Sequence, residues 1–218
     1  MGICIGNGKN GNCYLENGQV IKIYNNKNVL SGIPSEFVGL YNDTYVFPEK
    51  MILDVNTKKR IAAVFRYIDS LTLDKKDISI YDVIDSIDKC YIDTDKLSKQ
   101  GIRTFDVYPK NMMYNNDIKI IDIDYYYLSD DKDLFEDNIS DLNYGLGLLF
   151  FDTSKLCVDC PKLIMNNSDL FNLYNQTFMS LDNKTLKQFL IYLKDYIQEQ
   201  EQKEIKMVSE YRKILSRW

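Results

Sequence analysis

Two short segments of the chain hold residue types that together could bind and transfer a phosphate group. The first, residues 5–13, contains three glycines and is followed closely by Lys22. Glycine lets the backbone approach a phosphate and leaves its amides free to donate hydrogen bonds, and lysine adds a positive charge. The second, residues 106–124, combines carboxylates with an asparagine. Carboxylate and amide oxygens are the ligands that Mg²⁺ prefers, so the two segments predict a site for a phosphate and a metal ion.

The glycines Gly6, Gly8 and Gly11 form the pattern G-x-G-x-x-G. In dinucleotide-binding folds this pattern follows a strand and opens a helix. Here Asn17-Gly18 comes only a few residues later, and this pair accepts the positive φ angles of a type I′ turn. The segment therefore predicts a β-hairpin over residues 12–24 and argues against a Rossmann unit. A Walker loop is excluded because no Gly-Lys-Ser/Thr follows.

The acidic segment contains the spacing D-x-x-P-x-N, which begins at Asp106 and ends at Asn111. A carboxylate in this place can accept or orient the proton of an attacking hydroxyl, and the asparagine can supply a neutral oxygen to magnesium. A predicted hairpin over residues 112–121 then leads to Asp122, a second metal ligand. Aspartates at strand ends are often only solvated caps. This spacing, followed by a hairpin that ends at an aspartate, favours the functional interpretation.

In this order the two segments resemble the protein-kinase-like superfamily, in a small and divergent form. The resemblance implies an α+β, bilobal protein-kinase-like fold with a small antiparallel β N-lobe and a mainly helical C-lobe. Residues 1–67 would form the N-lobe, with the glycine-rich loop and the hinge strand. Residues 68–218 would form the C-lobe, with the catalytic and metal-binding loops. ATP and Mg²⁺ are the cofactors that the resemblance implies.

The resemblance also assigns roles to single residues. Lys22 is expected to contact the α and β phosphates and to pair with a carboxylate from a short helix, for which Glu36 is the first candidate and Glu49 the alternative. Asp106 is expected to be catalytic. The metal ligands are expected to be Asn111 and Asp122. The expected ATP-binding residues come from the glycine loop, the apolar walls around the adenine and the hinge: Ile5, Gly6, Gly8, Gly11, Cys13, Val20, Phe65, Arg66, Tyr67, Ile68 and Met113.

The leading expectation is therefore an enzyme, a minimal protein kinase that transfers the γ-phosphate of ATP to a Ser/Thr hydroxyl. The expected partners are ATP and a hydroxyl-bearing substrate, foremost a protein. Two alternatives stay open. Asp124 stands where protein kinases have glycine, and this resembles small-molecule kinases on the same fold. Tyr108 stands where a lysine commonly steadies the γ-phosphate, and this favours a pseudokinase, a module that binds a nucleotide or a partner without transfer.

Hydrophobic periodicity predicts the elements that would position these residues. Residues 1–67 predict strands, including a second hairpin over residues 50–67, with a short helix after Pro34 that Ser35 would cap. Residues 78–99 predict a long helix, and the chain after residue 134 is helical in pattern. The C-terminal helix is a candidate surface for a partner or a second copy. The clearest apolar stripe consists of Leu186, Phe189, Leu190, Leu193 and Ile197.

Composition narrows the classes of function. The 218 residues include no histidine, which excludes Ser-His-Asp triads and histidine-ligated metals. The net charge of −5 provides no basic field for nucleic acid or an anionic membrane. No apolar run approaches the ~18 to 20 residues of a membrane span, so we expect no membrane partner. Five cysteines with irregular spacing fit a reducing, cytoplasmic compartment, and the lone C-x-x-C from Cys157 to Cys160 is expected to be structural.

Overall fold

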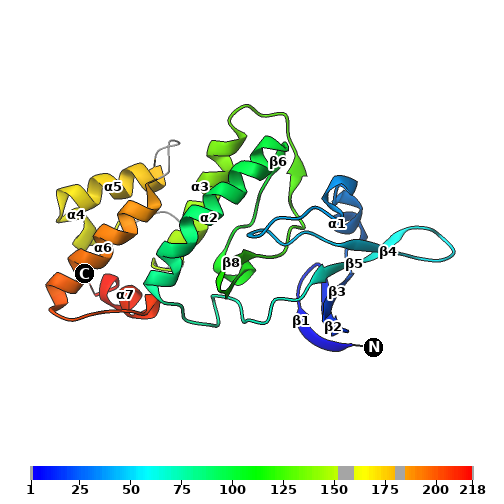
Figure 1. The fold of residues 1–218 in the computed structure, drawn as a ribbon, viewed down its shortest axis with the longest axis horizontal. Coiled ribbons are helices and arrows are strands. Elements are labelled where there is room, and N and C mark those ends of the chain that lie inside the picture. The colour runs from blue at the N-terminus through cyan, green and yellow to red at the C-terminus, as the bar shows by residue number, and fades with distance from the viewer. Residues whose placement is uncertain (1, 152–159, 180–184, 218) are drawn as a thin grey trace.

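A sheet at one end of the molecule and helices at the other make up the computed structural model, which describes residues 2–151, 160–179 and 185–217 (Figure 1). The sheet has five antiparallel strands in the order β1-β2-β3-β5-β4. The strands come first along the chain and most of the helices follow. The chain is therefore an α+β protein, as the sequence predicts.

Both predicted hairpins of the sheet are confirmed. The strands are β1 (Ile3–Asn7), β2 (Gly11–Glu16), β3 (Gln19–Tyr24), β4 (Lys50–Leu53) and β5 (Arg60–Arg66). Asn17 and Gly18 join β2 to β3 with φ angles of 50° and 75°, the positive values that a type I′ turn requires. The sheet ends at Arg66, beside the predicted lobe boundary, and no long strand follows it in the described residues.

Only one turn of the short helix predicted after Pro34 forms, and the predicted cap, Ser35, is wrong. Ser35–Phe37 form a single 3₁₀ turn, η1, with Pro34 and not Ser35 in the cap position. A six-residue helix, α1 (Lys27–Gly32), lies before it and is capped by the Asn26 side chain, which accepts a hydrogen bond from the Asn28 amide at 3.1 Å. Asparagine is a favourable N-cap, but so short a helix shows no apolar periodicity that would reveal it.

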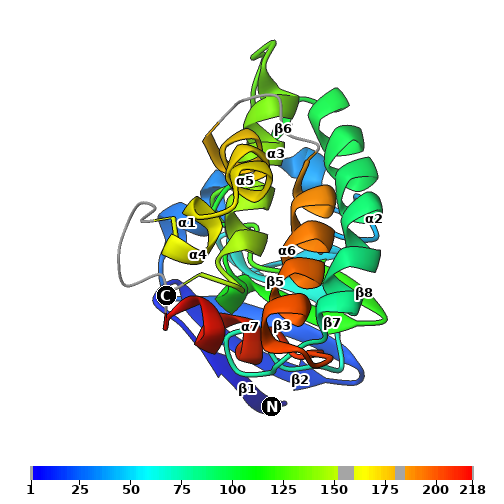
Figure 2. The same ribbon diagram turned by 90° about the vertical axis from the view of Figure 1, so that its left-hand side faces the viewer.

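The second half of the chain forms a helical layer around one long helix. This helix, α2 (Ile80–Lys99), is capped by Ser79 and confirms the prediction over residues 78–99. The other helices are α3 (Leu134–Gly147), α4 (Lys162–Met165), α5 (Ser168–Met179), α6 (Leu186–Glu201) and α7 (Val208–Leu215). Helix α2 packs against α3 and α6, and α5 packs against α6 (Figure 2). All five residues of the predicted apolar stripe on α6 are buried.

Helix α7 uses its apolar face within the chain. Val208, Tyr211, Ile214 and Leu215 are buried, and the Tyr211 hydroxyl donates to the Ile205 carbonyl at 3.0 Å. Association through this helix stays a prediction.

The predicted structural role of the C-x-x-C segment falls only partly within the described residues. Cys157 lies outside them, and the Cys160 side chain is buried. Within the described part of the chain, none of the helices combines the length and apolar character needed to cross a membrane.

Short strands connect the sheet to the helices. The predicted hairpin over residues 112–121 is confirmed as β7 (Met112–Asn115) and β8 (Asp117–Ile120), preceded by the 3₁₀ turn η2 (Pro109–Asn111). A second pair, β6 (Ile102–Arg103) with β9 (Tyr127–Leu128), brackets the segment that carries the candidate site residues. Its strands have only two residues each, too few for an alternating pattern to predict them.

Residues 42–46 tie the sheet to the helices. The Thr44 amide and hydroxyl both donate to Asp93 Oδ2 of α2, at 3.0 and 2.8 Å. On the other side, the Ile120 amide donates to the Thr44 carbonyl at 2.7 Å and the Val46 amide donates to the Ile120 carbonyl at 2.9 Å. The end of β8, and with it the position of the residues that follow, is therefore fixed relative to α2 and to the sheet.

We expect Asp93→Ala to lower the free energy of unfolding by about 2 to 4 kcal/mol, because it removes the carboxylate that accepts from the buried Thr44 hydroxyl and leaves the Thr44 amide with Asn42 Oδ1 as its remaining acceptor. Chemical denaturation measures this. The control is Asp95→Ala on the same helix: Asp95 is 39% exposed and pairs with Lys99, and such a pair contributes about 0.3 to 0.5 kcal/mol. Equal losses in the two variants would contradict the anchoring role of Asp93.

Candidate active site

Lys22 joins the sheet to the acidic segment. Its side chain lies in the middle of β3 and is only 10% exposed. Its ammonium lies 2.5 Å from Asp122 Oδ1 and 2.7 Å from Asp124 Oδ2, across about a hundred residues of sequence. The prediction that Lys22 and Asp122 converge is confirmed. Their roles toward a phosphate and a metal stay predictions.

The three charges form one electrostatic unit. Burial alone would lower the pKa of Lys22, but the charges of Asp122 and Asp124 outweigh it, so the pKa is raised above 10.5. Burial also raises the pKa of Asp122, and Lys22 does not offset this fully because Asp124 adds a like charge. For Asp124, Lys22 and three hydrogen bonds outweigh burial and lower the pKa. Two carboxylates thus share one ammonium, leaving a negative charge that a further cation would neutralise.

Asp124 is the most enclosed member of this cluster. Its side chain is 0% exposed and accepts hydrogen bonds from three residues, two on β3 and one in the glycine loop. Besides Lys22, the Tyr24 hydroxyl donates to Oδ1 at 2.8 Å, and Asn10 Nδ2 of the glycine loop donates to Oδ2 at 2.9 Å. Burial and the nearby Asp124 raise the pKa of Tyr24, so its hydroxyl stays protonated and remains a donor. Sequence reasoning singled out Asp124 only as a replacement of glycine and missed these contacts.

The predicted ion pair between Lys22 and Glu36 is wrong for this structure. Glu36 is exposed in the single turn η1, where it accepts a hydrogen bond from the Ser35 hydroxyl at 3.1 Å. The alternative, Glu49, is also exposed and accepts from Gln19 Nε2 at 2.7 Å. The physical reason is that no helix forms to carry Glu36 toward the sheet. The carboxylates that follow β8 contact Lys22 in its place.

Asp106 and Asn111 meet in a turn beside this cluster. Asn111 Nδ2 donates to the Asp106 carbonyl at 2.9 Å and to Asp106 Oδ2 at 3.0 Å. The Ile121 amide donates to the Asn111 carbonyl at 2.8 Å, which places this turn next to the residue that precedes Asp122. The predicted set of Lys22, Asp106, Asn111 and Asp122 is thus gathered in one region.

Two of these carboxylates stand on strained backbone. Asp106 has a φ of 55° and Asp122 a φ of 66°, in the left-handed region that residues other than glycine rarely adopt. Aspartate and asparagine tolerate this region best, and such conformations cost about 1 to 3 kcal/mol each. Strain of this kind persists where surrounding contacts impose it, and it is concentrated at functional sites.

Contacts from α2 and α3 hold the Asp106 turn in place. Asn138 is fully buried and accepts from the Thr104 amide at 2.8 Å and from the Thr104 hydroxyl at 3.1 Å. Its own amide group donates to the Ile102 carbonyl and to the Ser98 hydroxyl. Sequence reasoning missed Asn138, because a single polar residue in a helix pattern gives no signal of a distant partner. The residues just before Asp106 are therefore clamped to the helical layer.

Gly145 lets helix α3 approach this turn. A Cβ atom at this position would lie 2.1 Å from the Val107 carbonyl oxygen and 2.8 Å from the Met112 side chain. The close approach explains why a glycine stands inside a helix, where it is otherwise unfavourable.

The sheet residues predicted to surround an adenine share one face of the sheet. Cys13 pairs with Lys22, and Val20 pairs with Phe65, in the antiparallel register, and cross-strand partners point to the same side. Met113 lies in β7 and bridges to Thr72, just after the predicted hinge. Whether these side chains contact a nucleotide stays a prediction.

The remaining predicted ATP-binding residues lie at the two ends of this face. Ile5 and Gly8 are exposed, and Gly6 lies opposite Cys13 in the register. The Gly8 amide donates to the Gly11 carbonyl at 3.0 Å, and Gly11 is buried. At the hinge, the Arg66 guanidinium donates to the carbonyls of Asn42 and Asp43, while Tyr67 is exposed and Ile68 packs partly against the core.

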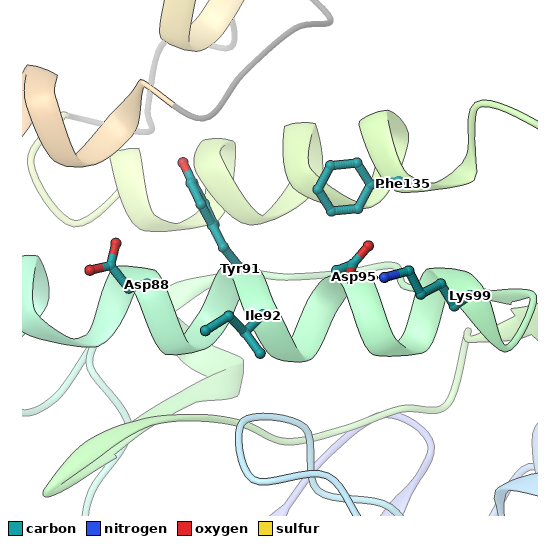
Figure 3. A pocket seen from close by; sticks show the side chains of 6 residues that line it. All are labelled: Asp88, Tyr91, Ile92, Asp95, Lys99 and Phe135. Carbon is teal, nitrogen blue, oxygen red and sulfur yellow. Dashed lines mark hydrogen bonds and ion pairs between the residues drawn. The ribbon is translucent and has the colours of Figure 1, made fainter.

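A separate hollow of about 530 Å³ lies along helices α2 and α3 (Figure 3). Its lining residues are Asp88, Tyr91, Ile92, Asp95, Lys99 and Phe135. None of them belongs to the predicted site.

In the described residues, no group of three or more His, Cys, Asp and Glu side chains is arranged to hold a metal by itself. A metal ion at the predicted site of Asn111 and Asp122 would therefore need amide or ligand oxygens as well.

Comparisons with known proteins add no family to this picture. No protein-family model matches the chain, and no curated protein sequence matches it. The functional assignment therefore rests on the geometry of Lys22, Asp106, Asn111, Asp122 and their neighbours.

We expect Gly145→Ala to lower the free energy of unfolding by about 1 to 3 kcal/mol, because the new methyl group must displace either α3 or the Val107 backbone. Chemical denaturation measures the loss. Gly32→Ala in α1 is the control: nothing lies within 4 Å of a Cβ atom there, so a change within about 0.5 kcal/mol is expected. A neutral Gly145→Ala would show that the turn adjusts freely.

Proposed function

We propose that the chain is an ATP- and Mg²⁺-dependent phosphotransferase with a bilobal protein-kinase-like fold. The sheet of residues 1–67 would be the N-lobe and residues 68–218 the C-lobe. The contact of Lys22 on the sheet with Asp122 of the acidic segment carries this proposal, because it brings a phosphate-binding cation and a metal-binding carboxylate together. The substrate class that we propose is a Ser/Thr hydroxyl of a protein.

The glycine loop supports a phosphate-binding role. Gly11 is required by the fold, because a Cβ atom there would lie 2.4 Å from the Ile23 carbonyl oxygen. Gly6 and Gly8 have neither a positive φ nor a crowded position: a Cβ atom would meet its nearest neighbour at 3.6 and 3.7 Å, which is ordinary contact. Close approach of a ligand to the backbone would explain glycine at both positions.

The donor set beside Lys22 fits Mg²⁺. Asp122 supplies a carboxylate that is 33% exposed. Asn111 uses its amide nitrogen to bind Asp106, and no hydrogen bond among the described residues uses its amide oxygen, which is therefore available as a ligand. Oxygen ligands of this kind suit a hard cation. When bound, Mg²⁺ would neutralise charge on the phosphate oxygens.

The contacts of Asp106 support a role for its carboxylate toward the substrate hydroxyl. Its carboxylate is held by Asn111, and its other oxygen lies 3.4 Å from the Lys110 ammonium. In the proposed reaction, Asp106 orients the substrate hydroxyl and accepts its proton. The hydroxyl oxygen forms a bond to the γ-phosphorus, the bond from that phosphorus to the β–γ bridging oxygen breaks, and ADP leaves. Lys22 binds phosphate oxygens, so that much of the catalysis comes from placement.

We expect Asp106→Asn to keep Mg·ATP affinity within about twofold and to reduce phosphate transfer about 10²- to 10⁴-fold, because it removes the proton acceptor and keeps the hydrogen-bonding shape. Asparagine also tolerates the positive φ of this position. Calorimetry measures binding, and labelled ATP with a generic protein substrate measures transfer. Unchanged transfer would show that Asp106 is not the base.

The same assay separates the alternative functions. If the wild type binds ATP without any transfer, the chain is a nucleotide-binding module and not an enzyme. The direct Lys22–Asp122 contact is compatible with this outcome too. Transfer to small hydroxyl compounds but not to proteins would assign a small-molecule kinase.

We expect Asp122→Asn to raise the Mg²⁺ concentration needed for half-maximal ATP binding by at least about tenfold, because a neutral amide is a poorer ligand than a carboxylate. Titrating Mg²⁺ at fixed ATP measures this. Asp117→Asn is the matched control: Asp117 begins β8, the strand that leads to Asp122, but it pairs with Lys89 at 2.5 Å, so the Mg²⁺ dependence should not change. Identical titrations for Asp122→Asn and wild type would exclude Asp122 as a ligand.

A further inference from the structure

The proposed site lacks the helix carboxylate that its lysine is expected to use. Helix α1 contains no acidic residue, and Glu36 is exposed in η1. A buried ammonium needs a partner to remain charged, because desolvation of an unpaired charge is costly. Within the described part of the chain, the carboxylates that contact the Lys22 ammonium are Asp122 and Asp124.

These two carboxylates differ in what else they can do. Asp122 is 33% exposed, so it can reach a ligand from the solvent side. The Asp124 side chain is 0% exposed, and both of its oxygens already accept hydrogen bonds, Oδ1 from Tyr24 and Oδ2 from Lys22 and Asn10. An enclosed, saturated carboxylate is poorly placed to bind a metal and well placed to hold a lysine.

Asn10 connects this carboxylate to the glycine loop. Its side chain donates to Asp124 at 2.9 Å and to the Tyr125 hydroxyl at 3.2 Å. Its carbonyl accepts from the Asn25 amide at 2.9 Å, just after β3. The end of the loop is therefore held at two points, one on the sheet and one on the segment that follows Asp122.

We infer that Asp124 is a positioning residue, which replaces the missing helix carboxylate as the permanent partner of Lys22 and fixes the glycine loop through Asn10. This inference rests on the proposed phosphotransferase function. When Mg²⁺ binds, Asp122 separates from Lys22 and becomes a ligand of the metal ion. Asp124 stays paired with Lys22 and keeps its ammonium in place for the phosphates. Nothing in the sequence pattern assigns this role, because the aspartate stands where the resembling family has glycine.

Kinetics test the positioning role. Asp124→Asn should lower kcat at least about tenfold, since one charge-assisted contact is lost. The Mg²⁺ requirement should stay that of the wild type, unlike in Asp122→Asn. In a Lys22→Met background, Asp124→Asn should have little further effect, because both residues act through the same ammonium. A Mg²⁺ requirement raised as in Asp122→Asn would make Asp124 a metal ligand instead, and additive losses in the two backgrounds would also overturn the inference.

A second measurement needs no catalysis. Without nucleotide, an amine-acetylating reagent followed by peptide mass spectrometry reports how firmly Lys22 is held. We expect labelling of Lys22 to be several-fold faster in Asp124→Asn than in the wild type or in Asp117→Asn. Tyr24→Phe removes one hydrogen bond to Asp124 and keeps the carboxylate, so it should increase the labelling of Lys22 less. This variant still tests the inference if Asp124→Asn does not fold. Unchanged labelling in both the Asp124→Asn and Tyr24→Phe variants would overturn the inference.

The kinetic and labelling experiments distinguish a failure of the inference from a failure of the proposed function. If the wild type transfers no phosphate, the proposed function fails, while the labelling experiment still decides whether Asp124 holds Lys22. If transfer occurs and labelling of Lys22 does not change, the function stands and the inference fails.

Discussion

A buried ammonium shared by two carboxylates is the interaction on which the rest of this structure depends. Burying a charge costs several kcal/mol, and the loss of one partner from a buried pair costs about 3 to 5 kcal/mol. Lys22 therefore requires the segment of Asp122 and Asp124 to lie against the sheet. Because that segment follows the β7–β8 hairpin, the requirement also sets where the hairpin and the neighbouring Asp106 turn must be.

Contacts from the helical layer hold the segments around Lys22 and its two carboxylates in place. Asp93 holds residues 42–46, which pair with β8. Asn138 clamps the residues before Asp106, and Gly145 lets α3 come close to Val107. These contacts come from α2 and α3, which lie between the sheet and the helices α4 to α7 in Figure 1. The helical layer thus fixes the positions of these loops relative to the sheet.

The sequence predicted the elements whose signals are local. Alternating apolar residues and the Asn17-Gly18 turn were enough for the hairpins, and a periodic apolar face was enough for α2 and α6. The convergence of Lys22 with Asp122 was also predicted, although only through a resemblance in the order of motifs. The composition of single segments does not contain that information.

What sequence reasoning missed depends on contacts between distant residues. Asp124 was visible in the sequence, but its pairing with Lys22 follows from the absence of a helix carrying Glu36, and the local pattern there predicted such a helix. Asn138 and Asn10 are common polar residues whose partners lie far away in the chain. Hydrogen bonds of this kind are set by tertiary packing, which periodicity and spacing do not report.

The left-handed backbone at Asp106 and Asp122 has an evolutionary consequence. At φ angles of 55° and 66°, the replacements that strain the chain least are glycine and asparagine. Both remove the negative charge while relieving or preserving the conformation. Backbone conformation alone therefore would not retain an aspartate at either position. What opposes its loss is the side chain, because Asp122 pairs with the buried Lys22 and Asp106 accepts from Asn111. An aspartate that persists at these positions is maintained by such interactions against the preference of the backbone.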